Sequence, residues 1–185
     1  MTDKRLILVG GGARSGKSRF ALTLARRLGA RRLFVATGQA QDDEMRARIQ
    51  RHQQSRGPDF ATLEEPLALA GALGDVKDVD VVVIDCLTLW LANVLLDGKT
   101  PDQIETRVRE FSAVLVRRSF HAIVVTNEVG LGIVPETPLG RVFRDVAGSA
   151  HQELSQAADE VYFAALGTML RLKPVPTFIP WDENA

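Results

Sequence analysis

The chain has 185 residues, 45% of them hydrophobic and 25% charged, and its 23 Lys and Arg residues balance its 23 Asp and Glu residues. This length fits one domain of ordinary globular composition, and the balanced charge does not favour nucleic acid as a partner. The single cysteine, Cys86, excludes both a disulfide framework and a thiolate zinc cluster within the chain. The sequence begins without a secretory signal, and no apolar run approaches the roughly 18 residues of a membrane span, so we expect a cytoplasmic enzyme or binding protein.

Strand-like and helix-like segments alternate along the chain. In chain order the sequence predicts a strand at residues 6–9, a helix at 17–28, a strand at 33–36, helices at 41–55 and 67–73, a strand at 81–84, helices at 87–95 and 101–118, a strand at 122–125 and a helix at 139–158. The strands are short, β-branched and unbroken, as is typical of strands buried on both faces of a parallel sheet. The pattern predicts an α/β fold with right-handed crossovers.

The end of the chain carries a different pattern. VYFAALGTMLRLK predicts two strands that meet at Gly167 and Thr168 and form a hairpin at one sheet edge. PVPTFIPWDENA follows with three prolines, and we interpret residues 174–185 as an irregular tail after a single domain at 1–173. The stretch GLGIVPETPLG, residues 130–140, follows a strand end, where α/β proteins place binding loops.

A phosphate-binding pattern links the first strand to the first helix. LILVGGGARSGKS contains G-x-x-x-x-G-K-[ST], with these predicted nucleotide contacts: Gly11, Gly12, Ala13, Arg14, Ser15, Gly16, Lys17 and Ser18. Glycines let backbone N–H groups face phosphate oxygens, Lys17 reaches the β- and γ-phosphates, and the Ser18 hydroxyl ligates Mg²⁺. The alternative is a glycine-rich turn without a ligand, which the strand and helix context disfavours. We therefore expect a P-loop NTPase-type, mostly parallel sheet with helices on both faces and an antiparallel C-terminal edge hairpin.

Asp85 closes the apolar run VVVID and is the predicted acid of the magnesium shell. The alternative is that Asp85 caps the helix that follows, because an aspartate accepts hydrogen bonds from free N–H groups there. Both roles are compatible with each other.

His52 lies in the arginine-rich segment RARIQRHQQSR. On a helix over residues 41–55, Met45, Ile49, His52 and Arg56 share one face, so His52 can be a packing residue. Its surroundings favour a second role, because repulsion from guanidinium groups keeps an imidazole neutral and able to attack. The same cations would stabilise charge on a phosphate that approaches the nitrogen.

Four blocks of the sequence, in this order, resemble one enzyme family. They are GGARSGKS, VATGQAQDDEMRARIQRHQQSRG, VVVIDCLTLWLANVL and VVTNEVGLGIVPETPLGRVFRDVAGSAHQELSQAADEVYF. Together they closely resemble the bifunctional adenosylcobinamide kinase / adenosylcobinamide-phosphate guanylyltransferase of cobalamin biosynthesis. The phosphate loop alone is unspecific, whereas NEVGLGIVPE with DEMRARIQRH is very specific.

The resemblance implies two reactions and a covalent intermediate. A nucleoside triphosphate, ATP or GTP, phosphorylates adenosylcobinamide with Mg²⁺; GTP then loses pyrophosphate to form a GMP–histidine, and adenosylcobinamide phosphate takes up the GMP. The family's nucleophile matches His52, and some members carry a second histidine where this chain has Arg51. The resemblance also implies a homotrimer.

Further nucleotide contacts are implied by the same resemblance. They fall on Thr37, Gly38, Gln39, Gln53, Gln54, Ser55, Arg56, Glu64 and Asp85. The Glu64 carboxylate suits guanine, because it can accept from the N1 and N2 hydrogens that adenine lacks; the alternative is an exposed acid at a strand end. One rigid pose cannot place the γ-phosphate at an acceptor and the α-phosphate at His52, so we expect residues 38–58 to move as a unit.

Thr126, Asn127 and Glu128 end a predicted strand at the edge where ligands bind. They could position the acceptor hydroxyl, hold magnesium-bound water or, for Glu128, act as a base, while loop capping is the alternative. Two other functions compete with the family assignment: a plain P-loop kinase with a silent His52, and a non-catalytic nucleotide switch whose 130–140 loop binds a partner.

Overall fold

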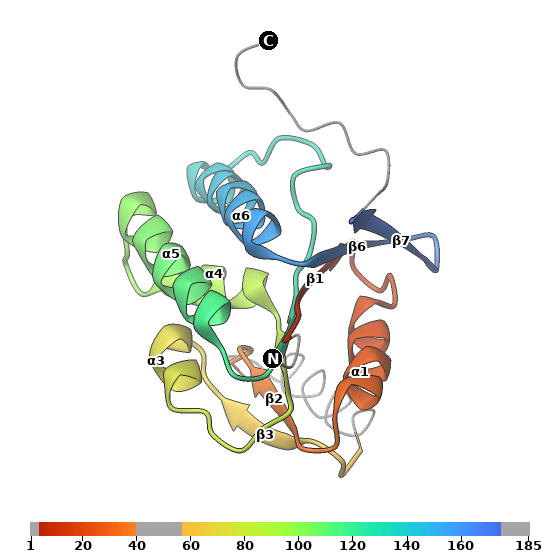
Figure 1. The fold of residues 1–185 in the computed structure, drawn as a ribbon. Helices are drawn as coiled ribbons and strands as arrows, with labels where there is room; N and C mark the ends of the chain where they lie inside the picture. The colour runs from red at the N-terminus through yellow and green to blue at the C-terminus, as the bar shows by residue number, and fades with distance from the viewer. Residues whose placement is uncertain (1–3, 40–56, 175–185) are drawn as a thin grey trace.

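A 7-stranded sheet in the order β3-β2-β4-β5-β1-β6-β7 forms the centre of the structure. The structure is a computed structural model that describes residues 4–39 and 57–174 (Figure 1). Its strands are β1 (Leu6–Gly11), β2 (Arg32–Ala36), β3 (Ala61–Glu64), β4 (Val81–Asp85), β5 (His121–Val125), β6 (Glu160–Ala165) and β7 (Thr168–Lys173). All neighbours pair parallel except β6 and β7, which pair antiparallel. The predicted fold class, with its C-terminal edge hairpin, is confirmed.

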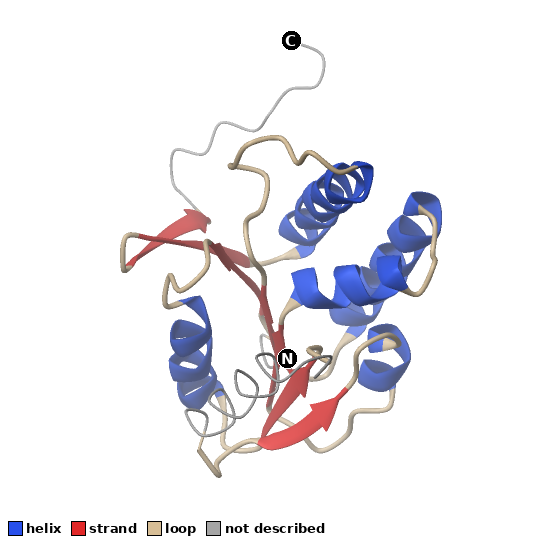
Figure 2. Cartoon of the chain, turned by 180° about the vertical axis from the view of Figure 1, so that it is seen from behind, coloured by secondary structure: helices blue, strands red, loops and turns tan. Residues whose placement is uncertain are grey.

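Helices cover both faces of the sheet, as Figures 1 and 2 show from opposite sides. The helices are α1 (Lys17–Leu28), α3 (Leu69–Gly74), α4 (Leu87–Leu96), α5 (Pro101–Arg117) and α6 (Pro138–Ala157). Helix α1 packs on one face, and α3, α4, α5 and α6 pack on the other. No helix within the described residues combines the length and the apolar character needed to cross a membrane.

The unbroken apolar strands contribute side chains to the core on both faces of the sheet. In β1, Ile7 and Val9 join the core on the α1 side, and Leu6 and Leu8 join the core on the opposite side. The four apolar residues of β4 divide in the same way and are fully buried. Alternate side chains point to opposite faces of a strand, so a strand between two helical layers needs an apolar residue at each position.

One strand, the start of one helix and the position of the hairpin turn differ from the sequence prediction. β3 is not among the predicted strands, because on this edge strand Leu63 alone is half-buried while its neighbours are exposed. α3 begins later than predicted, since the Glu65 carboxylate accepts hydrogen bonds from the backbone N–H of Leu67 and Ala68 and holds them in a turn. The hairpin turns one residue earlier than predicted, at Leu166 and Gly167, which both have the positive φ of a tight hairpin turn.

Two predicted segments lie outside the described residues. They are the predicted helix at residues 41–55 and the predicted tail from residue 175 onward. The remaining predicted helices all occur, with starts and ends that differ by a residue or two.

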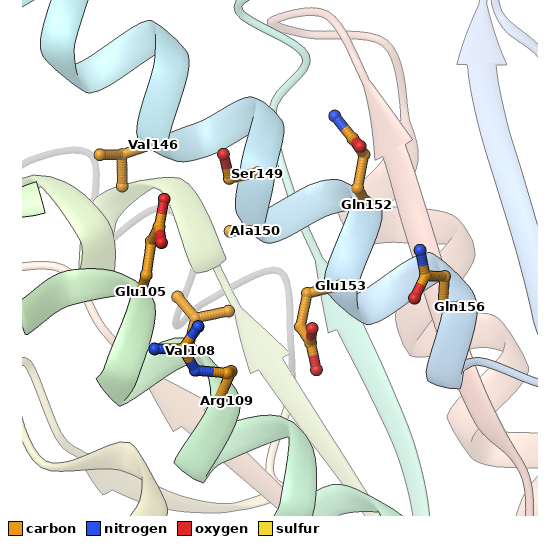
Figure 3. A pocket seen from close by; sticks show the side chains of 9 residues that line it. All are labelled: Glu105, Val108, Arg109, Val146, Ser149, Ala150, Gln152, Glu153 and Gln156. Atoms are coloured by element: carbon orange, nitrogen blue, oxygen red, sulfur yellow. The ribbon is translucent and has the colours of Figure 1, made fainter. Parts of the chain in front are cut away.

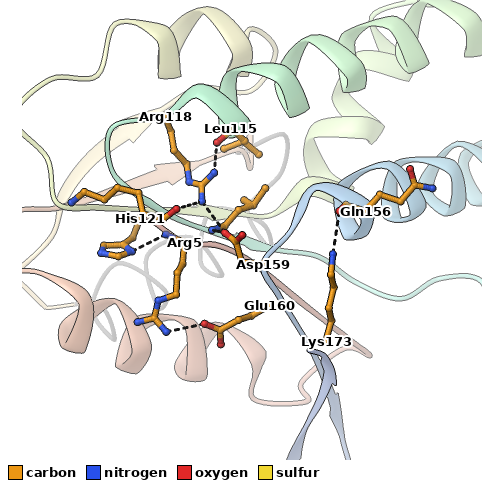
Figure 4. Close-up of polar contacts among 10 residues, drawn as sticks. Arg5, Leu115, Arg118, His121, Gln156, Asp159, Glu160 and Lys173 are labelled. Carbon is orange, nitrogen blue, oxygen red and sulfur yellow. Dashed lines mark hydrogen bonds and ion pairs between the residues drawn. The ribbon is translucent and has the colours of Figure 1, made fainter. Parts of the chain in front are cut away.

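Polar contacts tie the chain together where β1 and β6 begin (Figure 4). The Arg118 side chain is only 6% exposed and donates to the Lys4 carbonyl and, over 3.1 Å, to Asp159. The same Asp159 oxygen accepts from the Leu6 N–H at 2.6 Å. Arg5 adds an ion pair of 2.8 Å with Glu160. These contacts hold the amino-terminal ends of β1 and β6 together, at the end of the strands opposite the phosphate loop.

We predict that Phe111→Ala destabilises the protein by about 3–5 kcal/mol, because Phe111 is fully buried and packs on Trp90 with ring centroids 5.5 Å apart. Urea unfolding followed by circular dichroism measures the change. Val116→Ala on the same helix is the control, since Val116 is 58% exposed and should change stability by less than about 0.5 kcal/mol. Equal losses in the two variants would contradict the packing described for α5.

Candidate nucleotide-binding and catalytic site

The phosphate loop connects β1 to α1, and its backbone conformation favours glycine at both ends of the loop. Gly11 has φ 147 and Gly16 has φ 90, and a Cβ on Gly11 would lie 2.7 Å from the Ala164 carbonyl oxygen of β6. Arg14, between them, also has a positive φ of 55. The backbone therefore makes a tight turn against β6 before the helix begins, as a phosphate-binding loop requires.

Lys17 is held within this loop. Its side chain is buried, with the residue 7% exposed, and its Nζ donates to the Gly12 carbonyl oxygen at 2.9 Å. Its ammonium therefore lies over the turn of the loop, where it can reach phosphate oxygens.

Asp85 lies near Lys17, at the carboxyl end of β4. Burial and the negative charge of Asp85 raise the pKa of the neighbouring Cys86 thiol to about 11, while the positive charge of Lys17 acts in the opposite direction. Both charges therefore act on one buried thiol. The N-cap position of α4 belongs to Cys86, whose side chain makes no cap hydrogen bond, so Asp85 precedes the N-cap residue of that helix.

Ser18 and Asp85 suit Mg²⁺ as ligands. Hydroxyl and carboxylate oxygens are the donors that this hard cation prefers, and it commonly binds through one or two carboxylates together with substrate phosphates and water. The described part of the chain contains no cluster of three or more His, Cys, Asp or Glu side chains able to hold a metal.

Thr37 joins the ends of β2 and β4. It is fully buried, and its Oγ1 donates to the Cys86 carbonyl and accepts from the Cys86 N–H, both at 2.8 Å. Asn93 of α4 donates to the Thr37 carbonyl at 2.7 Å. Because the hydroxyl is engaged with Cys86, Thr37 shapes the strand ends, and the predicted nucleotide contact at this position stays a prediction. Gly38 and Gln39 continue toward the surface.

Glu64 lies apart from the phosphate loop. It ends β3 in register with Ala36 of β2, and it is exposed. The strand order places β2, β4 and β5 between β3 and β1. Glu64 thus shares the carboxyl edge of the sheet with the loop but sits at its far end.

A histidine that the sequence analysis missed joins the residues after β5. The Thr126 Oγ1 lies 2.7 Å from His151 Nε2, and His151 Nδ1 lies 3.5 Å from the Glu128 carboxylate. The Glu128 N–H donates to the Gly11 carbonyl at 3.0 Å, which ties this group to the phosphate loop. His151 follows Thr126 by 25 positions, inside a helix, so no local spacing could reveal the pair.

Asn127 points to a different neighbour. Its Nδ2 donates to the Thr88 hydroxyl at 2.9 Å, on the first turn of α4 beside Cys86. The side chains after β5 therefore divide, Glu128 toward α6 and Asn127 toward α4.

The structure brings together the phosphate loop, Asp85 and the residues after β5, and leaves Glu64 at a distance. The remaining predicted residues lie outside the described part of the chain: His52, Gln53, Gln54, Ser55 and Arg56. Their roles stay predictions.

A hollow of about 280 Å³ lies between α5 and α6, on the face of the sheet opposite α1 (Figure 3). Arg109 and Glu105 reach into it from α5, and Glu153 and Gln156 from α6. None of the phosphate-loop residues lines it, so it has no part in the site described above.

Comparisons with known proteins agree on one family. Residues 7–172 match the family described as cobinamide kinase / cobinamide phosphate guanyltransferase. The bifunctional adenosylcobalamin biosynthesis protein CobU of Escherichia coli strain K12 is 39% identical over 183 residues, covering 91% of this chain and 99% of that protein. The corresponding CobP of Pseudomonas aeruginosa is 41% identical over 170 residues, covering 91% and 98%.

Among solved structures, the RadB recombinase has a TM-score of 0.48 at 16% identity, covering 86% of this chain and 73% of that chain. A likeness at this level carries no argument about function.

We predict that His151 makes stability fall as the pH drops below its ordinary pKa of 6.5. Burial lowers the pKa of His151, against the opposing effect of Glu128, so the unfolded chain takes up a proton before the folded one. The contribution is complete above 6.5 and is lost as the pH falls toward the lowered value. Melting temperatures between about pH 7.5 and 5.5 should fall more steeply for the parent than for His151→Gln. If the melting temperatures of the parent and of His151→Gln fell equally with pH, a buried His151 with a lowered pKa would be contradicted.

Proposed function

The chain belongs to the cobinamide kinase / cobinamide phosphate guanyltransferase family, and on that premise we propose that it phosphorylates adenosylcobinamide and then converts the product to adenosylcobinamide-GDP with GTP. The family match over residues 7–172 is the observation that carries the proposal. The geometry of the phosphate loop supports it, because the Lys17 ammonium lies over the turn of the loop and two glycines with positive φ shape that turn, as in a loop that binds phosphate.

In the proposed first reaction, the substrate hydroxyl oxygen attacks the γ-phosphorus of ATP or GTP. A new O–P bond forms, the bond between the γ-phosphorus and the bridging oxygen breaks, and a nucleoside diphosphate leaves. Lys17 stabilises the charge on the transferring group, and Mg²⁺ held by Ser18 and Asp85 supplies further charge neutralisation when bound.

Glu128 is the base that we propose for this step. It lies against the phosphate loop through its N–H bond to Gly11, and its carboxylate is within 3.5 Å of His151. A neutral His151 that accepts from Thr126 at Nε2 carries its proton on Nδ1, facing Glu128. In this proposal, the Glu128 carboxylate accepts the proton of the substrate hydroxyl.

In the proposed second reaction, a ring nitrogen of His52 attacks the α-phosphorus of GTP and pyrophosphate leaves. The phosphate of adenosylcobinamide phosphate then attacks the same phosphorus, the P–N bond breaks and His52 is regenerated. The arginines around His52 in the sequence support this role, because they would stabilise charge on the passing phosphate. Gln53, Gln54, Ser55, Arg56 and Glu64 are proposed to hold the GMP portion.

Other parts of the proposal concern the whole protein. We propose that residues 1–173 form one catalytic domain, that the protein works in the cytoplasm and that it assembles as a homotrimer. The family resemblance supports the trimer, and the single continuous sheet of the described residues supports one domain.

The two proposed reactions should separate by mutation. Lys17→Ala should lower phosphorylation of adenosylcobinamide by about a hundredfold or more, because it removes charge stabilisation from the transferring group. His52→Ala should still form adenosylcobinamide phosphate but no adenosylcobinamide-GDP. Chromatography of the corrinoid products after incubation with GTP and Mg²⁺ measures both.

Arg27→Ala is the control, since Arg27 is an exposed cation at the other end of α1 and should leave both reactions unchanged. Formation of adenosylcobinamide-GDP by His52→Ala would contradict the covalent role of His52. Absence of any corrinoid phosphorylation by the parent would contradict the proposed function itself.

A further inference from the structure

A hollow of about 230 Å³ opens beside the phosphate loop, between α1 and the β6–β7 hairpin. Ser15 and Gly16 of the loop border it, and Arg19, Phe20 and Thr23 of α1 face Met169 of the hairpin across it. It is smaller than the roughly 300–1,000 Å³ typical of a site for a whole ligand, so it suits one part of a nucleotide.

A triphosphate on the loop, with its Mg²⁺ held by Ser18 and Asp85, would extend toward this hollow. Ser18 and Asp85 would hold Mg²⁺ against the β- and γ-phosphates, and Glu128 lies on the same side of the loop, after β5. The γ-phosphate therefore faces β4 and β5. In the strand order, β6 and β7 lie on the other side of β1, so the nucleoside end of the same molecule extends toward the hairpin.

Glu64 cannot hold the base in this pose. It ends β3, four strand positions from β1, which corresponds to roughly 19 Å across the sheet. A base at Glu64 would also require the triphosphate to run toward β4, in the direction already taken by its γ-phosphate. The strand order, together with the predicted Mg²⁺ ligands Ser18 and Asp85, therefore implies two positions for the base.

We propose that the hollow between α1 and the hairpin binds the purine and ribose of the triphosphate that donates its γ-phosphate, while the Glu64 position serves only guanylyl transfer. This inference rests on the proposed function and assigns a separate base subsite to each of its two reactions.

The chemistry of the hollow fits a purine of either kind. Phe20 offers an apolar surface and is braced by Tyr162, whose ring lies 5.0 Å away between centroids. Arg19 and Thr23 are exposed polar groups on the rim. None of the described residues that line the hollow is acidic. None of them can therefore accept hydrogen bonds from the N1 and N2 hydrogens of guanine through a carboxylate.

Ser15 adds a second, independent observation. Its Oγ is buried and has no hydrogen-bond partner among the described residues, and the residue borders the hollow. A buried hydroxyl without a partner is costly, and a bound nucleotide would supply an acceptor.

Thr23→Trp tests the subsite by filling it. The matched control is Thr106→Trp on α5, because both threonines are exposed and each donates its hydroxyl to the carbonyl four residues earlier, at 3.0 and 2.9 Å. Calorimetry with ATP and Mg²⁺ measures binding to the full chain, and the label from the α-phosphate of GTP that becomes bound to protein measures guanylylation.

We expect Thr23→Trp to weaken ATP binding by at least about tenfold, to raise the KM for ATP in adenosylcobinamide phosphorylation by a similar factor, and to change protein labelling by less than about twofold. Glu64→Gln should show the reverse, with labelling reduced and ATP binding retained. Thr106→Trp should match the parent in each measurement.

Unchanged ATP binding in Thr23→Trp would overturn the subsite, and so would an equal loss of ATP binding and labelling, which indicates a single base position. A parent that binds ATP but phosphorylates no corrinoid would refute the proposed function, and calorimetry on the two tryptophan variants would still decide the subsite.

Discussion

The close approach of the phosphate loop to β6 at Gly11 is the constraint on which the site depends. A side chain at this position would meet the Ala164 carbonyl oxygen at 2.7 Å, so the loop can pass there only as glycine. The Gly11 carbonyl accepts from the Glu128 N–H, and the next carbonyl, of Gly12, accepts from the Lys17 ammonium. One tight turn therefore holds both the lysine predicted to contact the phosphates and the residue proposed as base. Displacing the turn would move both.

The strand order explains how one phosphate loop can serve two reactions. β1 lies between the hairpin on one side and β5, β4, β2 and β3 on the other. Groups suited to the γ-phosphate gather toward β4 and β5, whereas the predicted guanine-binding acid lies at the end of β3. Because these groups are fixed on strands of one sheet, the proposed change of reaction would move the nucleotide to a different pose without rearranging the sheet.

Much of this arrangement follows from local sequence. Unbroken β-branched runs predict the buried strands, and the spacing of Gly11, Gly16 and Lys17 predicts the loop, because each rests on neighbouring residues alone. β3 could not be predicted in this way, because an exposed edge strand needs no apolar pattern. It is defined by its pairing with β2. The role of His151 could not be predicted either, because its contacts with Thr126 and Glu128 form only when α6 folds against the residues that follow β5. The Thr37 hydroxyl shows a further limit of local patterns, since its partner Cys86 lies 49 positions away.

The phosphoryl and guanylyl groups of GTP are both proposed to reach the same corrinoid, the second through the protein. A single-turnover experiment with GTP carrying different labels on its α- and γ-phosphates tests this most directly, in the presence of adenosylcobinamide and Mg²⁺. We predict that the γ label appears on the corrinoid first, that the α label appears on the protein in an acid-labile form, and that both labels end in one corrinoid product. Transfer of the γ label alone, with the α label never leaving the free nucleotide, would contradict it.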